Sequence, residues 1–409
     1  MQEVLKKIKP NQKERKQFDE IVSTFLGKLN SNLNDAKATL GGSGAKDTWL
    51  SGNHDIDFYV QFDYTKFKDK SAEISNLLKE TLKKSFPKSK IDKLHGSRDY
   101  FQINYKNISF EIVPIIKINK AEDALNITDI SPLHAIWVNK RTKELKDDIR
   151  LAKQFCKANK LYGAESHLSG FSGYVLEILI AYYGSFEKLL KASQKWKDKE
   201  VVDPEKHYKK NMVSFNLNRS KLRSPLIVID PVDKSRNAAA ALSLEKFILF
   251  KETAKKYLKS PNKTLFEKEE VDFKKLKSEG HLIRLEIVPL IGKRDVIGMK
   301  LLKAFTLLKR ELKSFFLINF GWEWEEGNKA VFYFVLKENK LPDYEIRRGP
   351  PLKLKEAVTN FKSKYKNTFV EDGFVKTKVK VEFPLLKDFV NSLLKDKYFK
   401  EKLKSVKYL

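Results

Sequence analysis

The sequence has almost no cysteine, no long apolar run and too few acidic residues to balance its basic ones. One cysteine, Cys156, among 409 residues excludes an internal disulfide and suits a reducing compartment. No apolar run approaches the ~20 residues that a membrane helix needs, and the first residues lack the apolar core of a secretory signal. We therefore expect a soluble, cytoplasmic protein with no membrane partner.

The shortage of acidic residues leaves a large positive charge. The chain has 81 Lys and Arg against 53 Asp and Glu, a formal charge of +28 at pH 7. Hydrophobic residues make up 41% of the chain and aromatic residues 12%, so it is not a disordered basic tail. Such an excess points to a polyanionic partner. A thermophilic surface can also be rich in lysine, but it usually balances lysine with glutamate.

The first motif is a glycine-rich turn at residues 41–44. Its glycines free the backbone from steric limits on φ, and Ser43 can cap a short helix over residues 45–50 that ends before Gly52. A helix N-terminus presents unpaired N–H groups to an anion. We therefore predict that Gly42 and Ser43 belong to a phosphate-binding loop.

The second motif is the pair Asp55 and Asp57. These residues alternate with Ile56 and Phe58, so both carboxylates should project from one face of a strand, with Cα atoms roughly 7 Å apart. Two like charges this close are unfavourable unless a cation lies between them, and carboxylate oxygens suit Mg²⁺. The pair predicts a Mg²⁺ site; the alternative is two solvated aspartates after a glycine-rich turn.

A Gly-Ser turn, a short helix and an Asp-x-Asp strand, in this order, resemble the nucleotidyltransferase superfamily of polymerase β type. That superfamily uses a third carboxylate on a neighbouring strand. Glu111 fits this place because it lies on the opposite face from Phe110 and Ile112, in an apolar strand that we expect to end at Pro114. The alternative for Glu111 is a solvated surface residue.

Length and periodicity predict two to four domains, since 409 residues are too many for one hydrophobic core. The opening region should contain helices at 13–33 and 71–86 and strands at 55–60, 100–105 and 108–115, the last two joined at Lys106-Asn107. The next should contain helices at 147–159, 174–183 and 238–253, the last opened by Arg236-Asn237, and a short buried strand within 225–233. Residues 260–280 are polar and basic, and are the best linker candidate.

Beyond that segment the pattern predicts a βαββ unit. Its elements are a strand at 281–289, a helix at 296–313, and a hairpin of 315–324 with 330–336 around Glu325-Glu326-Gly327-Asn328. Aromatic residues in this unit could stack on RNA bases, although packing against its helix is the commoner outcome: Phe316, Phe320, Trp322, Phe332 and Phe334. A basic helix is expected at 352–365.

Several further segments occur in the order found in archaeal class I CCA-adding enzymes. They are Ser131–His134, Ile149–Phe155, Tyr162–Glu165, Gly170–Tyr174, Asp230–Asp233 with Arg236–Ala240, and Arg347–Pro351. The chain resembles this family from about residue 24 to 361. The resemblance implies an α+β multidomain fold: a polymerase-β-like nucleotidyltransferase head with a mixed sheet and helices (1–125), a helical neck (126–258), and a βαββ body with an α/β tail that binds tRNA (259–409).

The resemblance also implies an activity: template-independent addition of C, C and A to the 3′ end of tRNA from CTP and ATP, and it allows a homodimer. Asp55, Asp57 and Glu111 would be the catalytic carboxylates that bind Mg²⁺. The nucleotide-binding residues would be Gly42, Ser43, Lys46, His134, Lys153, Tyr162 and Arg236. Two positions depart from the family pattern: Lys46 where Arg is usual, which loses bidentate geometry, and Glu111 where Asp is usual.

Two other functions fit parts of the same pattern. Another terminal nucleotidyltransferase, such as a poly(A) polymerase, would use the same three carboxylates. A catalytically silent RNA-binding protein could keep the fold, but the presence of Asp55, Asp57 and Glu111 argues against this alternative.

Overall fold

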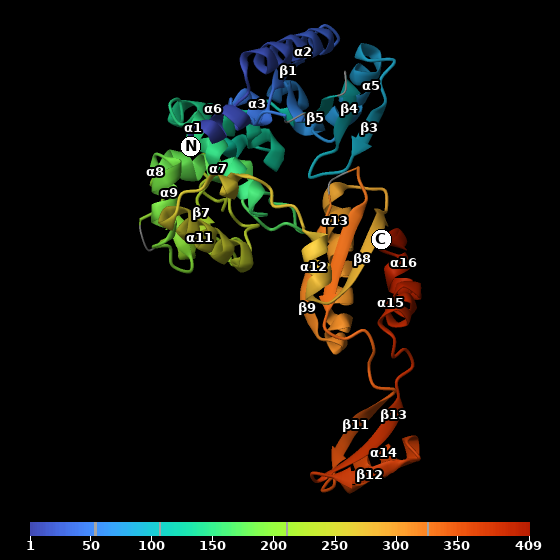
Figure 1. The fold of residues 1–409 in the computed structure, drawn as a ribbon. Helices are drawn as coiled ribbons and strands as arrows, with labels where there is room; N and C mark the ends of the chain where they lie inside the picture. Colours follow the sequence, from blue (N-terminus) through green and yellow to red (C-terminus); the bar gives the residue numbers. More distant parts are fainter. Residues whose placement is uncertain (53–54, 106–107, 210–211, 325–326) are drawn as a thin grey trace. The chain divides into compact units, whose positions relative to one another are not determined.

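The computed structural model describes residues 1–52, 55–105, 108–209, 212–324 and 327–409. They form two compact units, Met1–Glu269 and Glu270–Leu409 (Figure 1). The motif residues Asn53 and His54, the Lys106-Asn107 junction and Glu325-Glu326 of the predicted hairpin turn lie outside the described residues. Among the residues described, no helix combines the length and apolarity needed to span a membrane.

The first unit opens with a five-stranded mixed sheet in the order β1-β2-β5-β4-β3, in which only the β2–β5 pair is parallel. The strands are β1 (Ala36–Leu40), β2 (Asp55–Phe62), β3 (Ile91–Leu94), β4 (Tyr100–Tyr105) and β5 (Ile108–Ile116). Helices α2 (Gln12–Asn30) and α5 (Ile74–Ser85), both predicted, pack on the face that carries Ile56, Phe58 and Val60. The alternation of β2 therefore leaves Asp55 and Asp57 on the opposite face.

Two expectations for this region are wrong in detail. Pro114 does not end β5. Strand β4 pairs with β5 only as far as Ile112, so at Pro114 only β2 continues the ladder, and a residue paired on one side alone can lack an N–H. The short helix lies earlier than predicted, as α3 (Gly42–Ala45), and Ser43 does not cap it because the N-cap residue is Gly41. It ends early because Asp47 has a left-handed backbone (φ 48°). The other short elements are α1 (Gln2–Ile8), α4 (Tyr64–Phe67) and η1 (Lys68–Lys70).

The rest of the first unit is mainly helical. Its helices are η2 (Ala121–Asp123), η3 (Ile127–Ile130), α6 (Ser131–Arg141), α7 (Lys146–Ala158), α8 (Gly173–Tyr183), α9 (Phe186–Ser193), α10 (Val213–Asn216), α11 (Leu244–Lys259) and η4 (Lys263–Phe266). Two short strands, β6 (Glu200–Val202) and β7 (Leu226–Val228), pair in parallel. The predicted helix at 174–183 is α8, and it is central, with every residue from Val175 to Ile180 buried.

Two further expectations are corrected here. The helix predicted at 238–253 begins at Leu244, where Ser243 caps it; Asn237 instead holds a turn by accepting the Val228 and Ala239 amides. The predicted linker at 260–280 is structured: Leu265 and Phe266 are buried in the core of the first unit, and α12 (Phe273–Glu279) belongs to the second.

The second unit contains two antiparallel sheets. One has the order β14-β8-β10-β9, with β8 (His281–Pro289), β9 (Leu317–Glu323), β10 (Ala330–Leu336) and β14 (Leu403–Tyr408). Packed with it are α13 (Arg294–Glu311), η5 (Leu312–Phe315), α15 (Leu386–Lys395) and α16 (Lys397–Lys400). Phe332 and Phe334 are buried against Phe305 of α13, so they pack rather than stack on RNA, whereas Phe316 is 64% exposed.

The other sheet has the order β11-β13-β12 and carries the predicted basic helix. Its elements are β11 (Tyr344–Pro351), β12 (Thr368–Glu371), β13 (Phe374–Lys380) and α14 (Lys355–Lys364). Arg347 donates to the Tyr365 hydroxyl at the end of α14, so alternate residues of β11 face α14 and the others face away.

Candidate active site

The three predicted carboxylates lie on two neighbouring strands. Asp57 and Glu111 are direct Cα partners in the parallel β2–β5 ladder, and Asp55 is opposite Ser109. Burial raises the pKa of Asp57 and Asp55 adds to the rise, although Lys46 and Lys153 oppose it. Negative charge is therefore costly here without a cation. The described residues contain no cluster of three or more potential ligands already closed around one metal position.

The glycine-rich turn packs directly against Asp57. The Gly41 amide donates to the Asp57 carbonyl at 2.7 Å. Gly42 has a left-handed φ of 52°, and a Cβ at this position would lie 1.6 Å from Asp57 Oδ2. Only glycine combines this backbone conformation with this approach, so the turn and the acidic strand form one constellation.

The helical region holds the segment that follows the turn. Asn139 of α6 donates to the Ala45 carbonyl at 2.9 Å, and Lys146 of α7 donates to the Lys46 carbonyl at 2.7 Å. Arg150 reaches the Asp47 and Trp49 carbonyls at 2.6 and 3.1 Å, and Lys153 reaches the Thr48 carbonyl at 3.3 Å. Side chains outside the sheet thus bind five consecutive carbonyls, those of residues 45–49. Lys146, Arg150 and Lys153 bind four of the five, and their spacing of i, i+4 and i+7 puts them on one face of α7.

Lys46 and Lys153 converge on Glu177 of α8. Glu177 Oε2 lies 2.6 Å from Lys46 Nζ, and Oε1 lies 2.7 Å from both Lys153 Nζ and the Thr48 hydroxyl. Burial alone would raise the pKa of Glu177, but Lys153 and Lys46 outweigh it and lower the pKa to about 2. Burial lowers the pKa of Lys153 to about 8; Glu177 opposes this shift and Lys46 adds to it. One carboxylate facing two ammonium groups leaves this cluster with a net positive charge.

Tyr162 lies beside the same cluster. A Cβ at Gly173, the first residue of α8, would lie 2.8 Å from the Tyr162 hydroxyl and 3.3 Å from Lys153 Cε. Burial raises the pKa of Tyr162 further above its ordinary value, so its hydroxyl stays protonated well beyond neutral pH. Lys153 is likewise buried, unlike most lysines of a basic helix.

His134 and Arg236 meet at a second buried carboxylate, Asp230. His134 Nε2 lies 3.1 Å from Asp230 Oδ2, and Arg236 donates to the same oxygen at 2.9 Å. The Tyr174 hydroxyl donates to Oδ1 at 3.1 Å, and its ring stacks on His134 with centroids 4.2 Å apart. Burial opposes the shift, but His134 and Arg236 lower the pKa of Asp230 to about 2. His134 therefore lies inside α6 as part of a polar cluster.

Sequence reasoning missed the residues that hold these side chains. Glu177 is the one acid in the apolar run of α8, and a carboxylate in such a run is buried only with cationic partners. Asp230 lies in the segment Asp230–Asp233, where the sequence indicates no role for its individual carboxylate. Arg150, 1% exposed, gave no signal beyond its place on an amphipathic helix.

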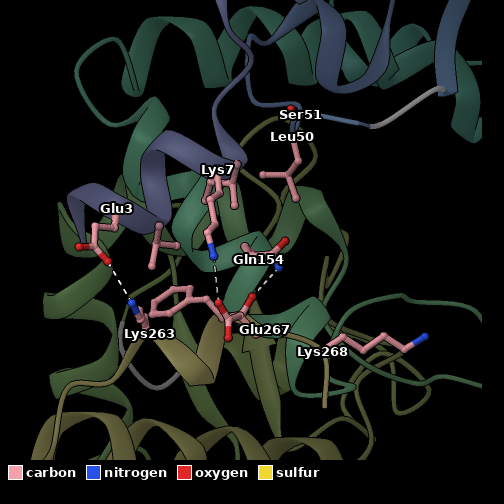
Figure 2. A pocket seen from close by; sticks show the side chains of 11 residues that line it. Glu3, Lys7, Leu50, Ser51, Gln154, Lys263, Glu267 and Lys268 are labelled. Carbon is pink, nitrogen blue, oxygen red and sulfur yellow. Dashed lines mark hydrogen bonds and ion pairs between the residues drawn. The ribbon is translucent and has the colours of Figure 1, made fainter. Parts of the chain in front are cut away.

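A cavity of about 420 Å³ lies between α1, the Leu50–Ser51 segment and η4 (Figure 2). Its lining mixes apolar and charged side chains, and the ion pairs Lys7–Glu267 (3.1 Å) and Lys263–Glu3 (3.3 Å) link residues of that lining. None of the predicted site residues lines this cavity. The cavity therefore does not serve as the candidate active site.

Two family models match the chain: "tRNA nucleotidyltransferase, second domain" at residues 147–267 and "Second Messenger Oligonucleotide or Dinucleotide Synthetase domain" at 1–150. A solved structure of the Cid1 poly(U) polymerase, a mutant bound to MgATP, superposes with a TM-score of 0.51 at 16% identity, covering 65% of this chain and 97% of that one. The fold is thus that of polymerase-β-like nucleotidyltransferases, and a tRNA nucleotidyltransferase model matches its helical part.

Curated relatives narrow this class to a family. The CCA-adding enzyme of Methanosarcina mazei is 31% identical over 394 residues, which cover 90% of this chain and 83% of that protein. The CCA-adding enzyme of Nanoarchaeum equitans is 45% identical over 236 residues, 57% of this chain and 58% of that protein. The chain belongs to the family of CCA-adding enzymes.

Proposed function

We propose that this enzyme adds C, C and A to the 3′ end of tRNA from CTP and ATP, without a template and with release of pyrophosphate. The 3′-hydroxyl of the RNA attacks the α-phosphate in line with the leaving pyrophosphate, and no side-chain nucleophile takes part. The observation that carries the proposal is the ladder register that sets Asp57 beside Glu111, with the glycine-rich turn packed on Asp57.

Asp55, Asp57 and Glu111 are the residues proposed to hold two Mg²⁺ ions. Their oxygens are the hard ligands that Mg²⁺ prefers, and the raised pKa of Asp57, caused first by burial, indicates a position where a cation relieves unfavourable charge. Bound there, Mg²⁺ would lower the pKa of the attacking hydroxyl and neutralise charge on the triphosphate. The chain's own part is to keep three carboxylates on adjacent strands.

The triphosphate is proposed to lie against Gly42, Ser43, Lys46, Lys153 and Tyr162. The net positive charge of the Lys46–Lys153–Glu177 cluster suits a polyanion and stabilises the charge that develops on pyrophosphate. His134 and Arg236, which share Asp230, are proposed to face the nucleoside or the RNA end.

The proposed domains are a catalytic head (1–125), a helical neck (126–258), and a body and tail (259–409) that bind tRNA. Residues 259–269 pack with the neck. In the three-stranded sheet, Tyr344 and Ile346 are 51% and 60% exposed on the face turned away from α14, opposite Lys380 and Lys378 of β13. An exposed tyrosine among lysines on an open sheet face suits RNA, because the ring can stack on a base and the lysines can contact phosphates.

Removing divalent cations tests the role of the carboxylates. Incorporation of CTP into tRNA trimmed at its 3′ end should fall to background in excess chelator and return when Mg²⁺ is restored in excess. Binding of the same tRNA, measured in parallel, should stay nearly constant, because phosphate contacts by Lys and Arg need no metal. Undiminished incorporation in chelator would contradict the metal assignment.

A further inference from the structure

Glu177 is the meeting point of three segments of the first unit. It is fully buried in the middle of α8, and its two oxygens accept from Lys46 and Thr48 of the segment after α3 and from Lys153 of α7. Thr48 is also buried and itself accepts from Lys153 at 2.8 Å. The direction of both lysine ammonium groups is therefore set by one carboxylate.

A buried ion cluster can be purely structural, and it then adds little net stability after the cost of desolvation. Here the direct contacts are unequal, since two ammonium groups lie 2.6 and 2.7 Å from the oxygens of one carboxylate. Lysine also carries a point charge on a flexible stem, so, unlike arginine, it has no rigid fork to orient it. A fixed carboxylate behind two lysines removes that freedom before an anion arrives.

We propose that Glu177 is a positioning residue for the triphosphate: it orients Lys46 from the head and Lys153 from the neck so that both ammonium groups act on the nucleotide. The inference rests on the proposed function. It goes beyond that function by assigning nucleotide affinity to a residue that does not itself touch the nucleotide.

Charge and positioning predict opposite results for Glu177→Gln. Removing a negative charge near a triphosphate would, through electrostatics alone, strengthen nucleotide binding. Loss of orientation weakens it, because each charge-assisted hydrogen bond to a phosphate then costs lysine side-chain freedom. A rise in the nucleotide KM therefore indicates lost positioning, and a fall indicates the electrostatic effect alone.

The experiment is steady-state kinetics on trimmed tRNA with the nucleotide varied. For Glu177→Gln, KM for CTP and KM for ATP should rise by the same factor, roughly tenfold to a hundredfold, while KM for tRNA stays unchanged. An unchanged or lowered nucleotide KM in a folded variant would overturn the proposal. The matched control is Glu205→Gln, which removes another neck carboxylate that binds Trp137 and Arg141, and should leave both KM values unchanged.

Two gentler variants keep the proposal testable if Glu177→Gln unfolds. Glu177→Asp keeps the charge and should give a nucleotide KM between those of wild type and Gln. Thr48→Val keeps the volume but removes one donor to Glu177, and should raise KM for both nucleotides by a smaller factor. Wild-type incorporation in the same assay separates the two claims: no C or A added by wild type rejects the proposed function, whereas normal addition with unaltered variant KM values rejects only this inference.

Discussion

Replacing Asp57 with asparagine should abolish nucleotide incorporation while leaving tRNA affinity nearly intact. Asp57 lies two residues after Asp55 on the same strand and directly beside Glu111 on the next strand. It is therefore the carboxylate that neighbours both of the others. Asparagine keeps the size but removes the charge that a metal needs. Losing several kcal/mol of charge stabilisation in the transition state lowers the rate on the order of 10³-fold or more.

Initial rates on trimmed tRNA and equilibrium binding of the same tRNA check this prediction. The matched control is Asp63→Asn. Asp63 lies just after the same strand, and its side chain caps α4 by accepting from the Thr65 and Lys66 amides. Asparagine is an equally good cap, so this variant should retain the wild-type rate. Near-normal incorporation by Asp57→Asn would show that the carboxylate is not a catalytic ligand.

Replacing Gly42 with alanine should cost about a hundredfold or more in rate, although no charge changes. The added Cβ would lie 1.6 Å from Asp57 Oδ2 and 2.6 Å from its Cγ, so either the turn or the carboxylate must move. The backbone at Gly42 is also left-handed, which costs an L-residue about 1–2 kcal/mol in stability. A displacement of ~1 Å at the reacting centre is enough for the expected loss.

Gly52→Ala separates the two effects of that substitution. Gly52 has a similar φ of 73°, but a Cβ there meets nothing within 4 Å. Both variants should therefore unfold at lower temperature than wild type, whereas only Gly42→Ala should lose incorporation while still folded. Equal loss of activity in both variants would mean that backbone strain, and not contact with Asp57, is responsible.

The parts of the site that depend on local periodicity could be predicted from the sequence. Alternation placed Asp55 and Asp57 on one face of β2 and put Glu111 in a strand, and the resemblance to the nucleotidyltransferase superfamily implied that this strand lies beside β2. The main helices and strands of both units follow from the same reasoning. Each of these signals is contained in fewer than about ten consecutive residues.

The support of the site could not be predicted, because it depends on side chains distant in sequence. Arg150 binds Asp47 across 103 positions and Lys46 binds Glu177 across 131. The wrong start predicted for α11 has a different origin. Asn237 and Ser243 can each accept from backbone amides at the start of a helix; Asn237 accepts from Ala239 in a turn, whereas Ser243 caps α11. Periodicity does not report on either kind of contact.

The measurement that tests the account most directly is the sequence of the products formed from trimmed tRNA with CTP and ATP together. Both nucleotides are proposed to use one site, so the preference must change as the RNA end lengthens beside Tyr162 and Arg236. Extension should stop when the completed end no longer fits with its hydroxyl in line. We expect C, C and A in this order, followed by arrest, and little extension of an unstructured RNA. Long A tails, or equal extension of the unstructured RNA, would contradict the account in favour of a poly(A) polymerase, and absence of any product with Mg²⁺ present would indicate a silent RNA-binding protein.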